Sequence, residues 1–326
     1  MPINHDELLE VLKDQGITDV IQIQRKPAAV RSRSSLSTVE ARRKDGTLLS
    51  FVEKSTEADS IPFENRMYTY FSGKKVPIPK VWHNTYDAAS SEGIVLLEDL
   101  TPGYRDLSDW KVPVDSYQVK QIAEAIAVFH AATWEAEDLP MPEHLASVQA
   151  YLTHLSYLER DYLLFKADQA FGMEEAALEV YEQSLAGLRR MADKRVERVN
   201  RYQNTVFIHG DLNVCNLLYP LHDKTGPRIL DLEAVKVGLC TEDLVMLFVH
   251  DLFHGGEETQ CIFDTYYREL CRRISSAYSY SQFTGDIRIA VMEGLFFPLK
   301  LYVHEGVRDE ELVYKSLNAY KQLLSS

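Results

Sequence analysis

The first sixty residues change from a helical to a strand-like pattern of apolar positions. Asn4 stands before leucines spaced three to four apart and Gly16 follows them, which predicts a helix between these two residues. The next apolar residues alternate with polar ones, and this period of two predicts strands over 18–26, 35–44 and 47–55. Asp45-Gly46 joins the last two and favours a hairpin, so we expect an antiparallel sheet.

A helix and two further strands complete this region. Residues 61–73 start near a proline and carry apolar side chains at helical spacing, which predicts a short helix. Strands are expected over 78–84 and 93–100, giving the order β-β-β-α-β-β. Strand signals then nearly vanish, and the turn residues of "TPGYRD" begin at Thr101. We therefore predict a domain boundary near residue 100.

Most of the remaining chain has the period of amphipathic helices. Segments with this period are 117–134, 143–165, 173–199, 241–253, 259–274, 286–303 and 309–324. One region interrupts them, with short apolar strands over 205–208, 216–219 and 228–235. The predicted fold is α+β, with a small antiparallel β-sheet domain that includes one helix (1–100) and a larger, mainly helical domain (101–326).

The interrupting region carries polar residues where its strands end. His209, Asp211 and Asn216 lie between the first two strands, and Asp231 interrupts the third. Any one of them is well explained as a turn residue, because Asp and Asn bond to nearby backbone in loops. The joint pattern H-G-D-x-x-x-x-N, followed by a hairpin and I-L-D, is much less expected by chance, so we expect these side chains to converge.

Such a set suits phosphoryl transfer from ATP. The charge on the phosphates must be neutralised by Mg²⁺, which prefers carboxylate and amide oxygens, so one Asp and one Asn can hold the metal. A further Asp can accept the proton of the attacking hydroxyl and orient it for in-line attack.

This region resembles the catalytic loop of the aminoglycoside phosphotransferase and choline-kinase-like superfamily, which has the two-lobed protein-kinase-like fold. The resemblance extends over nearly the whole chain. It implies that Asp211 is the catalytic base and that Asn216 and Asp231 are Mg²⁺ ligands. It also implies that His209 and Asp243 brace the loop rather than touch a ligand.

The first hundred residues match the nucleotide-binding N-lobe of this superfamily. "FVEKS" and "FENRMYTYF" imply that Lys54 reaches the ATP phosphates and that Glu64 is its ion-pair partner. The alternatives are a solvated strand-end lysine and a first-turn glutamate favoured by the helix dipole. "IVLLEDL" resembles the hinge strand, whose backbone would bind adenine at Leu97, Glu98 and Asp99.

Some positions depart from the superfamily or stay open. No G-x-G-x-x-G covers the phosphates; Ser32, Ser34 and Ser35 could donate to phosphate there, although a polar turn explains them equally well. Glu233 could face the substrate or a metal, or point outward from a strand. His130 is expected to be a core histidine satisfied by a neighbouring backbone group.

The composition of the chain limits the classes of binding partner that we expect. The 326 residues include 49 acidic and 35 basic ones, and the formal charge of −14 argues against nucleic acid or an anionic membrane as partner and is compatible with a cationic small substrate. No signal peptide or membrane span is indicated, so we expect a cytoplasmic protein. The four cysteines lack zinc-site or disulfide spacing and are expected to be reduced and structural.

The functional hypothesis is an ATP- and Mg²⁺-dependent phosphotransferase that acts on a hydroxyl group of a small molecule, aminoglycoside-like or amino-alcohol-like. The main alternative is a kinase-like pseudoenzyme or nucleotide-binding module without turnover. A protein kinase is less favoured, because "ILDLEAV" lacks the Phe-Gly of that class. The sequence specifies neither the acceptor nor the oligomeric state.

Overall fold

The chain divides into two compact units. Residues 1–107 and 216–235 form the first unit, and residues 108–215 and 236–326 form the second. The computed structural model describes residues 3–30, 34–57, 61–87, 92–107, 116–138, 141–168, 171–222, 226–253 and 255–324.

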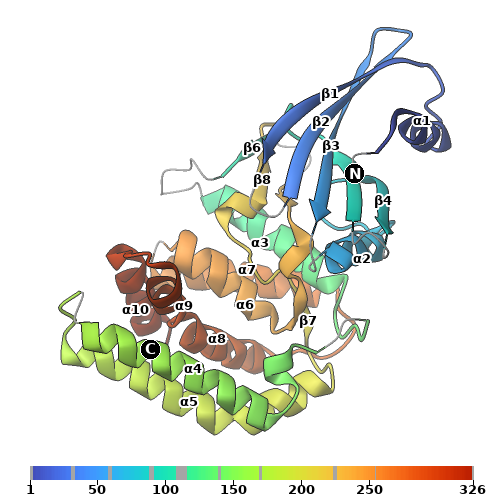
Figure 1. The fold of residues 1–326 in the computed structure, drawn as a ribbon. Coiled ribbons are helices and arrows are strands. Elements are labelled where there is room, and N and C mark those ends of the chain that lie inside the picture. The colour runs from blue at the N-terminus through green and yellow to red at the C-terminus, as the bar shows by residue number, and fades with distance from the viewer. Residues whose placement is uncertain are drawn as a thin grey trace. The chain divides into compact units, whose positions relative to one another are not determined.

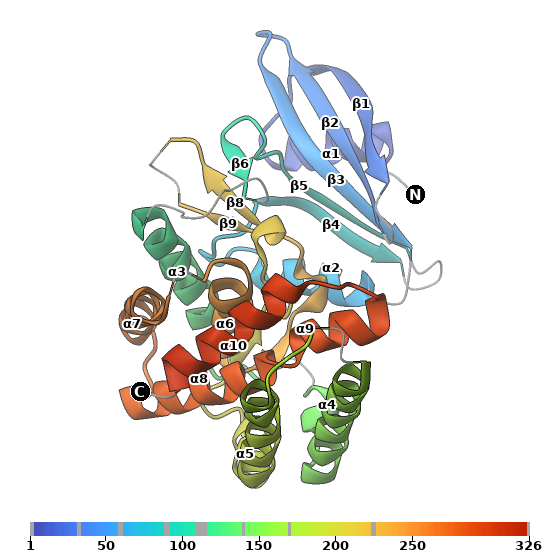
Figure 2. The same cartoon turned by 90° about the vertical axis from the view of Figure 1, so that its left-hand side faces the viewer.

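A five-stranded sheet forms most of the first unit. Its strands are β1 (Val20–Val30), β2 (Ser34–Arg43), β3 (Leu48–Glu57), β4 (Val81–Asp87) and β5 (Glu92–Glu98). They lie in the order β1-β2-β3-β5-β4, and every neighbouring pair is antiparallel (Figure 1, with β5 labelled in Figure 2). The predicted hairpin is confirmed: Arg42 pairs with Leu48, and Gly46 turns the chain with φ +86°. Only glycine adopts this backbone angle at little cost.

Helix α1 (His5–Asp14) packs against this sheet. The Asn4 side chain accepts a hydrogen bond from the Glu7 N–H at 2.8 Å, which is the predicted cap. Leu8 and Leu12 are fully buried and join the core residues of the strands. Helix α2 (Ile61–Phe71) contacts β4 and β5, so both predicted helices of this region are present.

A second, three-stranded sheet explains the division of the chain. Its strands are β6 (Tyr104–Asp106), β8 (Leu217–Pro220) and β9 (Arg228–Ile229), in the order β6-β8-β9. Because β6 pairs with β8, residues 101–107 and 216–235 belong to the first unit. With a single boundary near residue 100, as predicted from the sequence, residues 101–107 and 216–235 would both belong to the helical domain.

The third strand of the interrupting region is shorter than predicted. The sequence predicted a strand over 228–235, but β9 ends at Ile229 and Leu232–Ala234 form the 3-10 helix η3. Asp231 connects them in the left-handed conformation, with φ +61° and ψ +79°. A non-glycine residue is uncommon there, and such strain concentrates at functional sites.

Helices dominate the second unit. They are α3 (Ser116–Ala131), α4 (Val148–Asp168), α5 (Glu175–Asn200), α6 (Cys240–Val245), α7 (Gly256–Cys271), α8 (Tyr280–Gly294), α9 (Phe297–Lys300) and α10 (Glu310–Leu324). The 3-10 turns η1 (Glu143–Leu145) and η2 (Val214–Asn216) and the π-helical η4 (Met246–Asp251) and η5 (Leu301–Glu305) add to them. Helices α4 and α5 lie side by side in both views (Figure 1 and Figure 2). No helix in the described ranges is long and apolar enough to cross a membrane.

In the second unit, the region that interrupts the helices contains one short antiparallel pair of strands. Strand β7 (Val206–Ile208) pairs with β10 (Lys236–Gly238), and not with the strand that follows it in the chain. The sequence did not predict β10. A Cβ on Gly238 would lie 2.7 Å from Ile208 Cδ1, so a larger residue here would require the Ile208 side chain to shift.

The cap of α1 provides a test of local stability. Asn4→Ala removes the acceptor for the Glu7 N–H, and we expect it to lower the free energy of unfolding by about 1 kcal/mol. Urea denaturation followed by circular dichroism measures this change. Asn4→Asp is the matched control, since it keeps the acceptor and should stay close to wild type. Equal stability of Asn4→Ala and wild type would contradict the cap.

Candidate active site

The loop after β7 exposes the predicted base. Asp211 is exposed, its N–H donates to Nδ1 of His209 at 3.3 Å, and Asn213 Nδ2 donates to its Oδ1 at 3.1 Å. His209 is fully buried. Because Nδ1 accepts a hydrogen bond, a neutral His209 carries its proton on Nε2. The carboxylate of Asp211 is thus available to solvent while the backbone beside it is fixed.

Asp243 fixes the start of this loop. Its buried carboxylate accepts hydrogen bonds from the N–H groups of His209 (2.6 Å) and Gly210 (3.0 Å) and contacts His130 Nε2 (3.0 Å). Burial opposes its ionisation, but the hydrogen bond from His130 and the interactions with His209 outweigh this effect and lower the pKa of Asp243. Two side chains, Asp243 and Tyr266, satisfy His130, whereas the sequence led us to expect a backbone group.

Asp251 fixes the end of the loop, and sequence reasoning missed it. Its Oδ2 accepts the Val214 N–H at 2.8 Å. In an α-helix, residues 243 and 251 would point about 80° apart, because each residue turns by about 100°. The π-helical η4 takes up an extra residue in its turn and brings the two directions closer together. Burial, and to a lesser extent the charge of Asp211, raises the pKa of Asp251.

His250 lies next to Asp251 in η4. It is 4% exposed, and its Nδ1 contacts Ser316 Oγ at 3.1 Å. Lys315 Nζ donates to its backbone oxygen at 3.1 Å. Burial, helped by the charge of Lys315, lowers the pKa of His250 to about 3, so the imidazole is neutral at physiological pH.

In the first unit, three predicted residues come together. Lys54 Nζ donates to Glu64 Oε1 and to Asp231 Oδ1, each at 2.8 Å. Burial acts against the charge of Lys54, but Glu64 and Asp231 outweigh it and raise the pKa of the ammonium group. Burial also raises the pKa of Glu64, partly offset by Lys54. The pair is therefore buried and charge-assisted, in the position that the resemblance implies.

The same place has the ligands for a hard cation. Glu64, Asp231 and Glu233 each offer a carboxylate oxygen, and these atoms lie within 4.8 Å of one another. The backbone oxygen of Asn216 accepts the Leu230 N–H at 2.9 Å, which places Asn216 beside the residue that precedes Asp231. Carboxylate and amide oxygens are the ligands that Mg²⁺ prefers, so this donor set fits that ion.

The predicted hinge ends β5. Leu97 lies in the strand, and the Glu98 N–H donates to the Lys80 oxygen at 2.8 Å. Asp99 accepts a hydrogen bond from Ser50 Oγ. Burial opposes ionisation of Asp99, but the hydrogen bonds that it accepts lower its pKa. The backbone N–H of Glu98 is thus already used in a hydrogen bond within the first unit.

The predicted serine loop is partly described. Ser35 Oγ lies 2.7 Å from Ser55 Oγ on the paired strand. Ser34 starts β2, but its side chain and all of Ser32 fall outside the described structure. Among the described side chains, Ser35 therefore contacts the residue that follows Lys54 in β3.

Known proteins resemble this chain in sequence pattern and in fold. The model of the phosphotransferase enzyme family matches residues 29–270. No curated protein matches the chain.

Solved structures share the fold over almost the full length. A Ralstonia eutropha protein assigned to the aminoglycoside phosphotransferases is 14% identical in sequence. The match covers 96% of this chain and 95% of that protein, and its TM-score is 0.55. The macrolide 2′-phosphotransferase of Brachybacterium faecium is 16% identical, with a TM-score of 0.53 over 98% and 99% of the two chains. A type I macrolide 2′-phosphotransferase is 14% identical, with a TM-score of 0.51 over 97% of each chain. The predicted protein-kinase-like fold is confirmed.

The buried neutral His250 makes stability depend on pH. The unfolded chain takes up a proton on this residue near pH 6.5, whereas the folded chain does so only near a pKa of about 3. Its contribution is therefore complete above about pH 6.5 and is lost as the pH falls. Between about pH 7.5 and pH 5.5, wild type should lose about 1.4 kcal/mol more stability than His250→Asn. Urea denaturation at both pH values measures the difference, and equal losses would contradict the assignment.

Proposed function

The chain belongs to the phosphotransferase enzyme family, and from this premise we propose that it transfers the γ-phosphoryl group of ATP to a hydroxyl group of a small molecule in a Mg²⁺-dependent reaction. The observation that carries the proposal is the position of Lys54, whose ammonium group bridges Glu64 and Asp231. A buried cation beside a cluster of carboxylates suits the phosphates of a nucleotide and their metal ion.

The first unit would hold the nucleotide. In this proposal Lys54 donates to the α- and β-phosphates, and Glu64 keeps the ammonium group in place. Backbone groups of Leu97, Glu98 and Asp99 would contact adenine, and Ser34 and Ser35 would donate to phosphate. Because Glu64 and Asp231 already hold the ammonium group of Lys54 in place, this group needs little rearrangement to bind a phosphate.

Asn216 and Asp231 would hold Mg²⁺, and Glu233 is a third candidate ligand from the same cluster. The ion would neutralise charge on the β- and γ-phosphates and orient them. The strained backbone of Asp231 fits this role, since the left-handed conformation directs its carboxylate to both Lys54 and the other acidic groups.

Asp211 would accept the proton of the acceptor hydroxyl. The hydroxyl oxygen forms a bond to the γ-phosphorus, the bond from this phosphorus to the bridging oxygen of ADP breaks, and the proton moves to the Asp211 carboxylate. His209, Asp243 and Asp251 would be positioning residues, because they hold the backbone on both sides of Asp211.

The acceptor would be a hydroxylated small molecule, aminoglycoside-like or amino-alcohol-like. The competing function is a nucleotide-binding module without turnover. Both functions use Lys54 and Asp231, but only the enzyme needs Asp211 for chemistry.

Replacement of the base tests the reaction. Asp211→Asn keeps the size of the side chain and the contact with Asn213, but it cannot accept the proton. We expect kcat for phosphorylation to fall by about a hundredfold or more while ATP binding stays unchanged. A coupled assay for ADP formation, run with a panel of hydroxylated amines and sugars, measures turnover. Asn213→Ala is the control, because it removes the contact with Asp211 and leaves the Asp211 carboxylate in place. An Asp211→Asn variant with wild-type turnover and intact ATP binding would exclude Asp211 as the base.

Removal of a metal ligand tests nucleotide binding separately from turnover. ATP should raise Tm more with Mg²⁺ than without it, because the ion links the phosphates to Asp231. Asp231→Asn should abolish most of the Mg²⁺-dependent part of the shift, whereas Asp211→Asn should keep it. A thermal shift assay with and without Mg²⁺ measures this. A Mg²⁺-dependent shift without turnover on any acceptor would favour the binding module, and no Mg²⁺ dependence in wild type would contradict the metal site.

A further inference from the structure

A row of buried polar side chains extends from His130 into the helices of the second unit. Each member is at most 4% exposed. The members are His130 of α3, Cys240 of α6, Tyr266 of α7, Tyr278 between α7 and α8, and Asp286 of α8. The contacts that hold the loop of Asp211 include only His130, so the proposed function assigns no role to the other four.

Tyr266 is the member of this row that contacts His130. Its hydroxyl oxygen lies 2.7 Å from His130 Nδ1, while Nε2 of the same ring lies 3.0 Å from Asp243 Oδ2. The two rings meet edge to face with their centroids 5.7 Å apart, and the ring of Phe283 stacks on Tyr266. His130 is thus held between a hydroxyl group of α7 and the carboxylate that fixes the loop.

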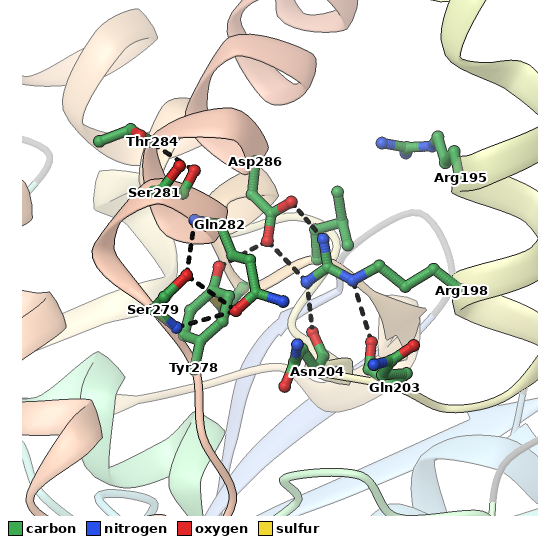
Figure 3. A network of polar contacts seen from close by, with 12 residues as sticks. Arg195, Arg198, Gln203, Asn204, Tyr278, Ser279, Ser281, Gln282, Thr284 and Asp286 are labelled. Carbon is green, nitrogen blue, oxygen red and sulfur yellow. Dashed lines mark hydrogen bonds and ion pairs between the residues drawn. The ribbon is translucent and has the colours of Figure 1, made fainter.

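An ion pair anchors the other end of the row. Figure 3 shows Arg198 donating to both carboxylate oxygens of Asp286, and the Tyr278 hydroxyl also donates to this carboxylate. Cys240 Sγ lies 3.7 Å from the hydroxyl oxygen of Tyr278. Burial raises the pKa of Cys240 to about 12, so the sulfur is a protonated thiol at physiological pH.

The number of protons determines the direction of these hydrogen bonds. Because Tyr278 gives its only proton to Asp286, the thiol of Cys240 donates to Tyr278 rather than accepts from it. Tyr266 has two acceptors, Nδ1 of His130 and the sulfur of Cys240, and a ring nitrogen is the stronger one. Burial raises the pKa of Tyr266 well above its usual value, so its hydroxyl keeps the proton and donates it to Nδ1.

This donation selects one tautomer of His130. A neutral imidazole has one N–H group and one lone pair in its plane. Only the tautomer with the proton on Nε2 can accept from Tyr266 and donate to Asp243 at the same time. In the other tautomer, the lone pair of Nε2 would face the carboxylate, and the buried charge of Asp243 would lose one of its donors. The hydroxyl group of Tyr266 therefore affects how firmly Asp243 is held.

We propose that Tyr266 is a positioning residue for phosphoryl transfer. Its hydroxyl group keeps His130 in the tautomer that donates to Asp243, and this carboxylate fixes the loop that carries the base. The inference rests on the proposed function, which it deepens. It adds a residue of α7 that acts through other side chains of the protein and not on the ligand.

The tautomer of His130 tests the first step in the unaltered protein. NMR spectra of the full chain with isotope-labelled histidine distinguish a ring nitrogen that carries a proton from one that does not. We expect the proton of His130 on Nε2 in wild type. A wild-type His130 with its proton on Nδ1, or with protons on both nitrogens, overturns the proposal. This measurement needs neither turnover nor a variant that folds.

Two deletions of a buried hydroxyl group separate positioning from stability. Tyr266→Phe keeps the ring on Phe283 and removes the donor to His130, and we expect kcat to fall about tenfold with KM for ATP unchanged. Tyr278→Phe is the matched control, because the hydroxyl group that it removes donates to Asp286 instead. Its kcat should stay close to that of wild type, even where its Tm falls as much as in Tyr266→Phe. A wild-type kcat in Tyr266→Phe, or an equal fall in both variants, overturns the proposal.

Hydrogen exchange of the loop separates this inference from the proposed function. The N–H groups of His209 and Gly210 donate to Asp243, so their exchange reports how firmly this carboxylate holds the loop. Mass spectrometry should show faster exchange of this peptide in Tyr266→Phe than in wild type or Tyr278→Phe. Equal exchange in all three proteins, with an active wild type, would overturn the inference and leave the phosphotransferase intact. Faster exchange in Tyr266→Phe alone, with no turnover in wild type, would support the hold on the loop and contradict the phosphotransferase.

Discussion

The buried carboxylate of Asp243 is the interaction on which the rest of the site depends. Burial of a charge is costly unless several donors surround it, and Asp243 meets this condition with two backbone N–H groups of the loop and the ring of His130. The loop cannot move without leaving this charge unpaired. Asp211 can therefore be exposed to solvent and still keep a fixed position, as its proposed role as a base requires.

Both units contain a buried cation shared by two carboxylates, but the surrounding charges differ. In the first unit, Lys54 stands against Glu64, Asp231 and Glu233, which leaves an excess of negative charge that a divalent cation can neutralise. In the second unit, Arg195 stands against Glu242 and Glu293, and these glutamates line a cavity together with Asp243 and Lys236. The excess of negative charge around the shared cation is therefore smaller in the second unit than in the first.

The sequence predicted those structural features that depend on interactions between nearby residues. The Asn4 cap and the Asp45-Gly46 turn act over a few residues, and both features are present. The contact between Lys54 and Asp231 joins residues 177 apart in sequence, so it could be expected only through the resemblance to a family. The three-residue strand β10 and the π-helical η4 have no local signature, because long-range packing forms them. For this reason the role of Asp251 was not visible in the sequence.

The first unit is built from two separate stretches of chain, with Lys54 on one and both Asn216 and Asp231 on the other. A fragment that ends near residue 107 therefore lacks two strands of its own smaller sheet. Genetic exchange of a segment that ends between residues 54 and 231 would separate the lysine from the acidic residue that it contacts. Point substitutions therefore preserve this contact more readily than the exchange of such segments between related chains.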